Sequence, residues 1–185
     1  MMSQNKKVFA IIPSAGSGTR FSSKLPKQYS KIDNETIIEK TLRHFIRLKE
    51  IEKIIIPVSP EDKHILDLEV VKNERIQVIN GGATRAESVL EGLKLLASGS
   101  TVIVHDVVRP FVSPDMIINL INNFNYENED ALIYGIPVYE ALKKINLENL
   151  SVKSSVDRNE FYLAQTPQIC LTDFLRDSIE SCLKD

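Results

Sequence analysis

A short apolar run near the N-terminus leads into a loop of small residues. Val8–Ile12 is followed by Pro13-Ser14-Ala15-Gly16-Ser17-Gly18-Thr19-Arg20. Such a loop after a strand leaves backbone N–H groups uncovered, and these groups can bind a polyphosphate. Arg20, and Lys27 seven residues later, add two cations that could neutralise a triphosphate while one of its bonds breaks. The segment therefore predicts a nucleotide site.

The spacing of this loop differs from the two commonest phosphate-binding patterns. A Walker A loop and a dinucleotide-binding fingerprint would each need a further glycine where this chain has Phe21. The alternative is an ordinary strand-to-helix turn whose glycines only permit positive φ. Arg20 and Lys27 favour the nucleotide site. Because Pro26 disfavours a helical Leu25, we expect Lys27 on a loop that folds back over the phosphates.

A second group of polar residues follows the apolar run Val102–Val104, in His105-Asp106-Val107-Val108-Arg109. A carboxylate at this place either caps the next turn or holds Mg²⁺ against a triphosphate. Arg109 could bind an anionic substrate or form a salt bridge to a helix end. No second histidine is spaced to join His105, so a zinc site is not expected.

Runs rich in Ile and Val alternate with amphipathic stretches along most of the chain. This alternation predicts an α/β fold with a doubly wound, mostly parallel sheet that binds ligands at the carboxyl ends of its strands. The small-residue loop, Gly81-Gly82 and His105-Asp106 all fall at such ends. The expected buried strands are Lys7–Ile12, Ile51–Val58, Ile76–Ile79, Thr101–Asp106 and Ala131–Pro137. The expected helices are Glu35–Lys49, Ala83–Ala97, with a capping box from Thr84 to Glu87, and Asp115–Phe124, opened by Ser113-Pro114.

The alternation breaks after Pro137. Leu142–Ile145 and Ser151–Val156 both mix polar and apolar residues, and they flank the turn-like segment Asn146–Asn149. This pattern predicts a protruding β-hairpin arm. An alternative is a solvated surface hairpin without a role.

Composition and length indicate one soluble domain over residues 1–185, with about 70% of the unfolded surface buried. The net charge of −2 gives no overall attraction to nucleic acid or to a membrane surface. No apolar run approaches the roughly 20 residues of a membrane span. The run after the basic start ends at Pro13, too short for a signal peptide. Cys170 and Cys182 fit no metal or redox spacing, so we expect reduced thiols in a cytoplasmic protein.

Four segments, in order along the chain, resemble the cytidylyltransferases that act on sugar-alcohol phosphates, and above all the methylerythritol phosphate branch of the non-mevalonate isoprenoid pathway. They are Ser14–Arg20 with Pro26-Lys27-Gln28, Gly81–Val89, His105–Phe111, and Val156-Asp157-Arg158 through Gln165-Thr166-Pro167-Gln168. Because these segments span nearly the whole chain, they are together more specific than any one of them.

The resemblance implies transfer of CMP from CTP to a polyol phosphate, with release of pyrophosphate and with Mg²⁺ as cofactor. It implies a homodimer in which the arm, residues 138–160, clasps the second subunit, and in which Arg158 acts in the partner's site. The implied catalytic pair is Arg20 and Lys27, and the implied nucleotide-binding residues are Ser14, Ala15, Gly16, Gly18, Gly81, Gly82 and Ser88. The implied substrate-binding residues are Asp106, which also holds the metal, Arg109, Arg158 and Thr166.

Two departures from the family pattern keep other functions open. Glu140-Ala141 stands where the family usually has Asp-Thr, so a substrate-contacting hydroxyl is missing. The sequence ends at Asp185, whereas family members continue through a further strand and helix that supply a lysine. The alternatives are a ribitol 5-phosphate cytidylyltransferase and an inactive CTP-binding dimerisation module.

Overall fold

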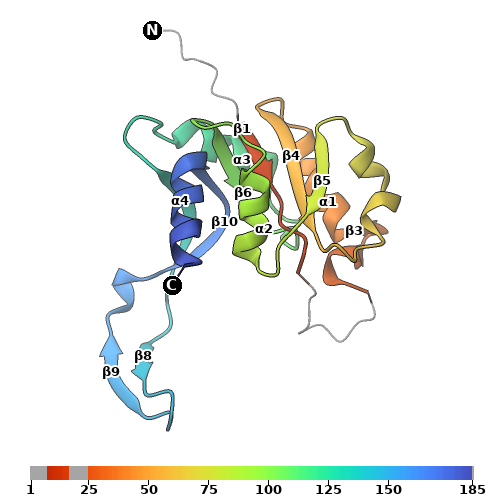
Figure 1. The fold of residues 1–185 in the computed structure, drawn as a ribbon. Helices are drawn as coiled ribbons and strands as arrows, with labels where there is room; N and C mark the ends of the chain where they lie inside the picture. The colour runs from red at the N-terminus through yellow and green to blue at the C-terminus, as the bar shows by residue number, and fades with distance from the viewer. Residues whose placement is uncertain (1–7, 17–24, 185) are drawn as a thin grey trace.

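The computed structural model describes residues 8–16 and 25–184, and its centre is a six-stranded sheet in the order β5-β4-β1-β6-β10-β7 (Figure 1). Neighbouring strands are parallel from β5 to β6, whereas β10 is antiparallel to both β6 and β7. The mostly parallel sheet predicted from the sequence is therefore confirmed. The strands are β1 (Val8–Ile11), β4 (Ile51–Val58), β5 (Ile76–Asn80), β6 (Thr101–Val104), β7 (Ala131–Pro137) and β10 (Tyr162–Leu171).

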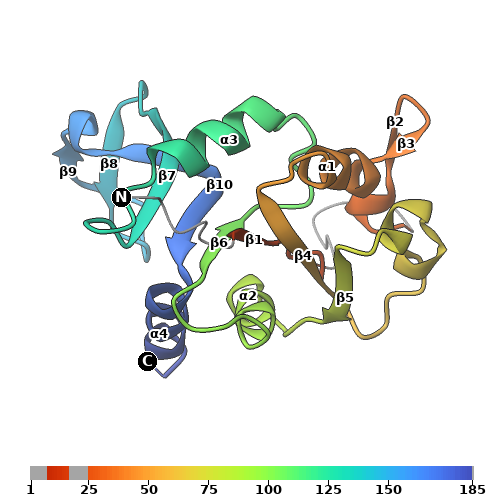
Figure 2. The same cartoon turned by 90° about the horizontal axis from the view of Figure 1, so that it is seen from above.

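Helices cover both faces of this sheet, as a doubly wound fold requires. Figure 2 shows α1 (Ile37–Ile46) and α3 (Pro114–Asn123) on one face, and α2 (Arg85–Leu93) and α4 (Thr172–Cys182) on the other. Alternate residues of each strand enter two separate apolar cores, so that Ile54 packs on the first face and Ile55 on the second. This alternation explains why the strands read as continuous Ile and Val runs.

Helix starts follow the capping signals of the sequence. In α2 the Glu87 amide donates to Thr84 Oγ1 at 3.1 Å, and the Thr84 amide donates to Glu87 Oε2 at 2.7 Å. Ser113 Oγ accepts from the Met116 amide at 3.2 Å at the start of α3. Both predicted caps are thus confirmed.

Three expectations about elements are wrong. α1 does not begin at Glu35, because β3 (Glu35–Thr36) pairs with β2 (Lys31–Ile32) before Thr36 caps the helix. β7 is an edge strand rather than a buried one, with Ile133 49% exposed. The predicted strand Thr101–Asp106 already ends at Val104, which leaves Asp106 on a loop. An apolar run by itself does not tell a core strand from an edge strand.

The predicted hairpin arm is confirmed as a protrusion. β8 (Leu142–Ile145) and β9 (Val152–Val156) pair antiparallel and extend from the body of the molecule (Figure 1). A short 3-10 helix, η4 (Arg158–Glu160), leads from the arm into β10.

The cysteines are free, with Cys170 buried and Cys182 exposed. Burial raises the pKa of the Cys170 thiol to about 11, which keeps it protonated. Within residues 8–16 and 25–184, no helix is both long enough and apolar enough to cross a membrane.

Candidate functional site

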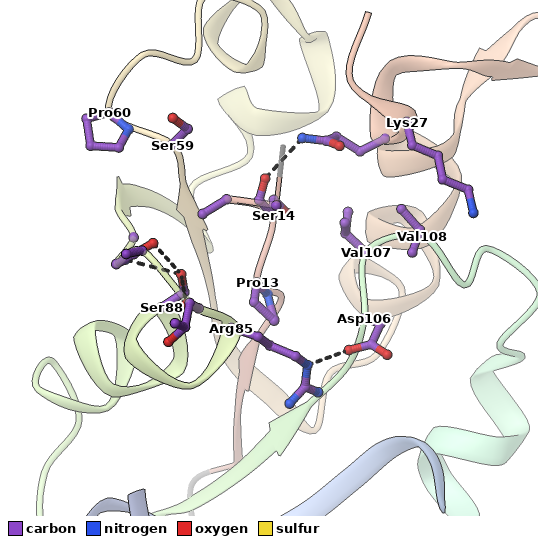
Figure 3. Close-up of a pocket in the computed structure, with 17 residues that line it drawn as sticks. Pro13, Ser14, Lys27, Ser59, Pro60, Arg85, Ser88, Asp106, Val107 and Val108 are labelled. Carbon is purple, nitrogen blue, oxygen red and sulfur yellow. Dashed lines mark hydrogen bonds and ion pairs between the residues drawn. The ribbon is translucent and has the colours of Figure 1, made fainter. Parts of the chain in front are cut away.

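A pocket of about 1000 Å³ lies where the loops after β1, β4, β5 and β6 meet (Figure 3). These are the carboxyl ends of the parallel strands, where the sequence pattern placed the site. The predicted residues that it brings together are Ser14, Ala15, Gly16, Lys27, Gly81, Gly82, Ser88 and Asp106.

The small-residue loop after β1 is fixed to the sheet at its first residues. The Ser14 amide donates to the Pro57 carbonyl at 2.7 Å, and Ser14 Oγ donates to the Ile12 carbonyl at 3.0 Å. Gly16 does not have a left-handed φ, and among residues 8–16 and 25–184, apart from its chain neighbour, no atom lies within 4 Å of the place where its Cβ would be. Backbone conformation therefore does not require this glycine, and open space in front of it suits a close ligand. Gly18 and Arg20 lie outside the described residues.

Lys27 lines the pocket from the side opposite the glycine turn (Figure 3). The expectation of a loop at this position is wrong, because Lys27 is the first residue of a 3-10 helix, η1 (Lys27–Tyr29). Pro26 is the N-cap residue, with φ −57° and ψ 143°. Proline restricts the residue before it and presets its own φ, so a helix can begin directly after it.

The glycine turn after β5 packs tightly against its neighbours. A Cβ on Gly81 would lie 2.8 Å from Ser88 Oγ and 2.9 Å from the Ala15 Cβ, so only glycine fits without a shift. Ser88 Oγ accepts from the Gly82 amide at 3.2 Å and donates to the Thr84 carbonyl at 2.9 Å. Ser88 therefore braces the turn whose backbone faces the pocket.

Asp106 is held between two arginines. Its Oδ1 accepts from Arg85 Nε at 2.8 Å, and its Oδ2 accepts from Arg109 Nε at 3.2 Å (Figure 3 shows the Arg85 pair). Its amide donates to Thr166 Oγ1 at 3.2 Å, while Arg109 also donates to Gln165 Oε1 at 2.7 Å. The structure thus brings Asp106, Arg109 and Thr166 together, and the partner of Arg109 is this carboxylate rather than a helix end.

A second cavity of about 570 Å³ adjoins this group. Arg109, Gln165 and Thr166 line it together with apolar residues of α3 and β7, among them Met116 and Tyr134. Arg158 lines neither cavity. It lies at the base of the arm, where its guanidinium donates to the Tyr139 carbonyl.

His105 directly precedes Asp106 in the chain and is fully buried. Its Nε2 is 3.1 Å from the Arg109 carbonyl oxygen, and since a carbonyl can only accept, the proton is on Nε2. Burial lowers the pKa of His105 to about 4. Within the described ranges no three His, Cys, Asp or Glu side chains cluster as a metal site. His105 is therefore a neutral structural residue that closes the turn from Asp106 to Arg109.

Sequence reasoning missed several residues of the pocket wall. Ser59 and Pro60 directly follow β4, and Arg85 opens α2. The position of Ser59 at the carboxyl end of a predicted strand was an available signal. The pairing of Arg85 with Asp106, 21 residues away, leaves no signal in the sequence.

Comparison with known proteins identifies one family of enzymes. The family model described as "IspD: 2-C-methyl-D-erythritol 4-phosphate cytidylyltransferase" matches residues 8–185. The protein of that name from Haemophilus ducreyi is 34% identical over 95% of this chain and 76% of its own length. One from Escherichia coli is 31% identical over 100% of this chain and 78% of its own length.

Solved structures give the same result. The 4-diphosphocytidyl-2C-methyl-D-erythritol synthase of Anaerococcus prevotii superposes with a TM-score of 0.81 at 30% identity, over 98% of this chain and 77% of that one. The 2-C-methyl-D-erythritol 4-phosphate cytidylyltransferase (IspD) of Francisella tularensis gives 0.75 at 32% identity, over 96% and 78%. The chain belongs to the 2-C-methyl-D-erythritol 4-phosphate cytidylyltransferase family.

Proposed function

We propose that this protein transfers CMP from CTP to 2-C-methyl-D-erythritol 4-phosphate and releases pyrophosphate. The observation that carries the proposal is the pocket at the strand ends, where Lys27, the Gly81-Gly82 turn and the Asp106 carboxylate face one space. Family membership supports this acceptor over ribitol 5-phosphate and over an inactive binding module.

The reaction needs no general base. An oxygen of the acceptor's phosphate monoester, already ionised at neutral pH, attacks the α-phosphorus of CTP. A new P–O bond forms as the bond to the bridging oxygen of the β-phosphate breaks, and pyrophosphate leaves with the electron pair. The work of the protein is to align two anions and to stabilise the charge of the transition state.

Lys27 and Arg20 supply positive charge for this step. Lys27 reaches the pocket from η1. The place of Arg20 in the sequence, at the end of the small-residue loop, suits the same role, although it lies outside the described residues. Each contact of this type is worth on the order of 3 kcal/mol to the transition state.

The residues present fit a magnesium ion bound together with the triphosphate. Mg²⁺ commonly takes one or two carboxylates and completes its coordination with phosphate oxygens and water. Asp106 is the acidic residue among the described residues of the pocket lining, and its paired arginines are half-exposed. Bound there, Mg²⁺ would neutralise phosphate charge, while Arg85 and Arg109 keep the carboxylate oriented.

The nucleotide base belongs at the glycine turn. The turn presents backbone groups held in place by Ser88, and the packing of Gly81 against Ala15 leaves no room for an added methyl group. Membership of a family of cytidylyltransferases favours a pyrimidine here, so competition binding should rank CTP above ATP and GTP. Equal binding of all three would indicate a site for phosphates alone.

The acceptor belongs beside Arg109 and Thr166, at the entrance to the second cavity. Arg158 points to a homodimer, because it lines neither cavity of its own chain and lies at the base of a protruding arm. Symmetric dimers are the commonest soluble oligomers. In such a dimer, the arm of one subunit would bring Arg158 to the acceptor phosphate in the other.

Pyrophosphate release tests the proposal. Purified protein with CTP and Mg²⁺ should release pyrophosphate with methylerythritol phosphate and much more slowly with ribitol 5-phosphate. Turnover of ribitol 5-phosphate alone would overturn the assigned acceptor. Thermal stabilisation by CTP without turnover of either acceptor would indicate a binding module.

A further inference from the structure

The two residues that follow Lys27 are buried, although they belong to a helix of only three residues. Gln28 and Tyr29 are each 4% exposed, and their side chains make hydrogen bonds to two different loops, Gln28 to the loop after β1 and Tyr29 to the loop after β4. Neither bond belongs to the site as described so far.

Gln28 attaches η1 to the small-residue loop. Its Nε2 donates to the Ser14 carbonyl oxygen at 3.0 Å, and the Ser14 amide is in turn bound to the Pro57 carbonyl of β4 at 2.7 Å. The contact is buried, so loss of the amide would leave the Ser14 carbonyl without this donor in a place shielded from water. Gln28 thereby fixes η1 to the sheet through Ser14.

Tyr29 attaches η1 to the loop after β4. Its hydroxyl donates to Asp62 Oδ2 at 2.6 Å, while Asp62 Oδ1 accepts from the amides of His64 and Ile65 at 2.9 and 3.0 Å. Burial and the Asp62 carboxylate raise the pKa of Tyr29, so its hydroxyl stays protonated and remains a donor. Asp62 follows Ser59 and Pro60, which line the pocket, so this bond joins η1 to the loop after β4.

Backbone bonds alone do not hold η1 in place. Its internal bonds run from the Tyr29 amide to the Pro26 carbonyl at 2.9 Å and from the Ser30 amide to the Lys27 carbonyl at 3.1 Å. One helical turn has no independent stability in water. The side-chain bonds of Gln28 and Tyr29, together with the bond from the Ile37 amide to the Ser30 carbonyl at 2.9 Å, therefore contribute to the orientation of η1, which carries Lys27.

We propose that Gln28 and Tyr29 are positioning residues that hold the Lys27 ammonium over the phosphates of the bound nucleotide. The inference rests on the proposed function, in which Lys27 stabilises the transition state. A displacement of about 1 Å at a group of this kind can cost about a hundredfold in rate. Loss of one of the two attachments should cost less than loss of Lys27 itself, because the other attachment remains.

Tyr29→Phe and Gln28→Met remove the hydrogen-bonding groups and nearly keep the volume, so both variants should fold. We expect each to lower kcat about tenfold while the KM for CTP changes less than about twofold. In a Lys27→Ala background the same changes should lower kcat less than about twofold, because residues that act through one group are not additive. Tyr126 lines neither cavity, so Tyr126→Phe is the matched control and should keep wild-type kcat.

Two kinetic outcomes would overturn the inference. One is wild-type kcat in both single variants. The other is the same tenfold loss in the presence and in the absence of Lys27, which would mean that the two side chains act on the fold and not through Lys27.

Hydrogen exchange separates failure of this inference from failure of the proposed function. If the wild-type protein releases no pyrophosphate with CTP and methylerythritol phosphate, the proposed function fails. Exchange at the Tyr29 and Ser30 amides then still measures the attachment of η1 without any substrate. Faster exchange in Gln28→Met at these two amides would support the attachment, and unchanged exchange would overturn it.

Discussion

The nucleotide pocket and the hairpin arm both carry residues for the proposed reaction, but the two regions are held together differently. Pocket side chains are fixed by bonds between distant segments: Gln28 to Ser14, and Arg85 and Thr166 to Asp106, across 14, 21 and 60 residues of sequence. The arm is a two-stranded hairpin whose tip residues Leu147 and Leu150 are 85% and 72% exposed.

The difference indicates where each region obtains its stability. The pocket forms only when the whole sheet has folded, since its walls come from the ends of four strands. An isolated two-stranded hairpin is marginal in water, and exposed apolar residues on it suit a surface that another chain covers. We therefore expect substitutions in the pocket to act within one subunit, and substitutions in the arm to act across two.

The largest effect should come from the two proposed catalytic cations. Lys27→Ala and Arg20→Ala should each lower kcat by about a hundredfold or more, because charge develops on the α-phosphoryl oxygens mainly in the transition state. The KM for CTP and the melting temperature should change little. Lys31→Ala, at an exposed lysine of β2, is the matched control. Near-normal turnover in Lys27→Ala or in Arg20→Ala would contradict the mechanism.

His105, the buried residue that directly precedes Asp106 and lines the second cavity, should make stability depend on pH. The pKa of His105 is about 4 in the folded protein, against 6.5 for an unperturbed histidine. Between these values the unfolded chain binds a proton that the folded chain does not, so stability falls as pH falls from 6.5 to 4. The loss should reach about 3 kcal/mol.

Urea unfolding at a series of pH values measures this dependence. His105→Gln keeps a donor for the Arg109 carbonyl and does not titrate, so its stability should fall less steeply over the same range. Equal slopes for the two proteins would show that His105 does not cause the loss.

Substitution of Arg158 tests whether the arm contributes to the acceptor site. Arg158→Ala should lower turnover about tenfold to a hundredfold, the cost of a charge-assisted bond to the acceptor phosphate. If Arg158 acts in the partner's site, subunit exchange between Arg20→Ala and Arg158→Ala proteins should restore about a quarter of wild-type activity. Half of the dimers would then be mixed, and each would carry one intact site.

Light scattering and the activity of the mixture show whether Arg158 acts in the site of the partner subunit or not. A monomeric wild-type protein, or no recovery after demonstrated exchange, would show that Arg158 does not serve a second subunit.

The smallest effects should distinguish two glycines of the pocket. Gly81→Ala should lower stability by about 1–3 kcal/mol and weaken CTP binding, because the new methyl group meets Ser88 and Ala15. Gly16→Ala should keep the melting temperature, since its Cβ would meet no atom of the described residues beyond its chain neighbour, and weaken CTP binding only if the nucleotide lies there. Thermal melts with and without CTP measure both effects, and unchanged CTP binding in Gly16→Ala would move the nucleotide away from this loop.

The sequence by itself determined the parallel strands of the sheet, the helix caps and the face of the molecule that carries the site. Ile and Val runs mark strands because both faces of a parallel sheet are buried, and the Thr84 and Glu87 cap is a local bond between neighbours in sequence. Ser14–Gly16, Gly81-Gly82 and Asp106 could be assigned to one site because parallel strands end at one edge.

Only the tertiary structure decided which of these residues touch, and where the sheet stops. Thr36 ends a β-hairpin before it caps α1, and β7 lies at an edge, because pairing with another segment decides both features. The ion pair of Arg85 with Asp106, and the bonds of Gln28 to Ser14 and of Tyr29 to Asp62, join residues 21, 14 and 33 positions apart in the chain. Local spacing carries no information on such contacts, since they form only when the sheet brings the loop ends together.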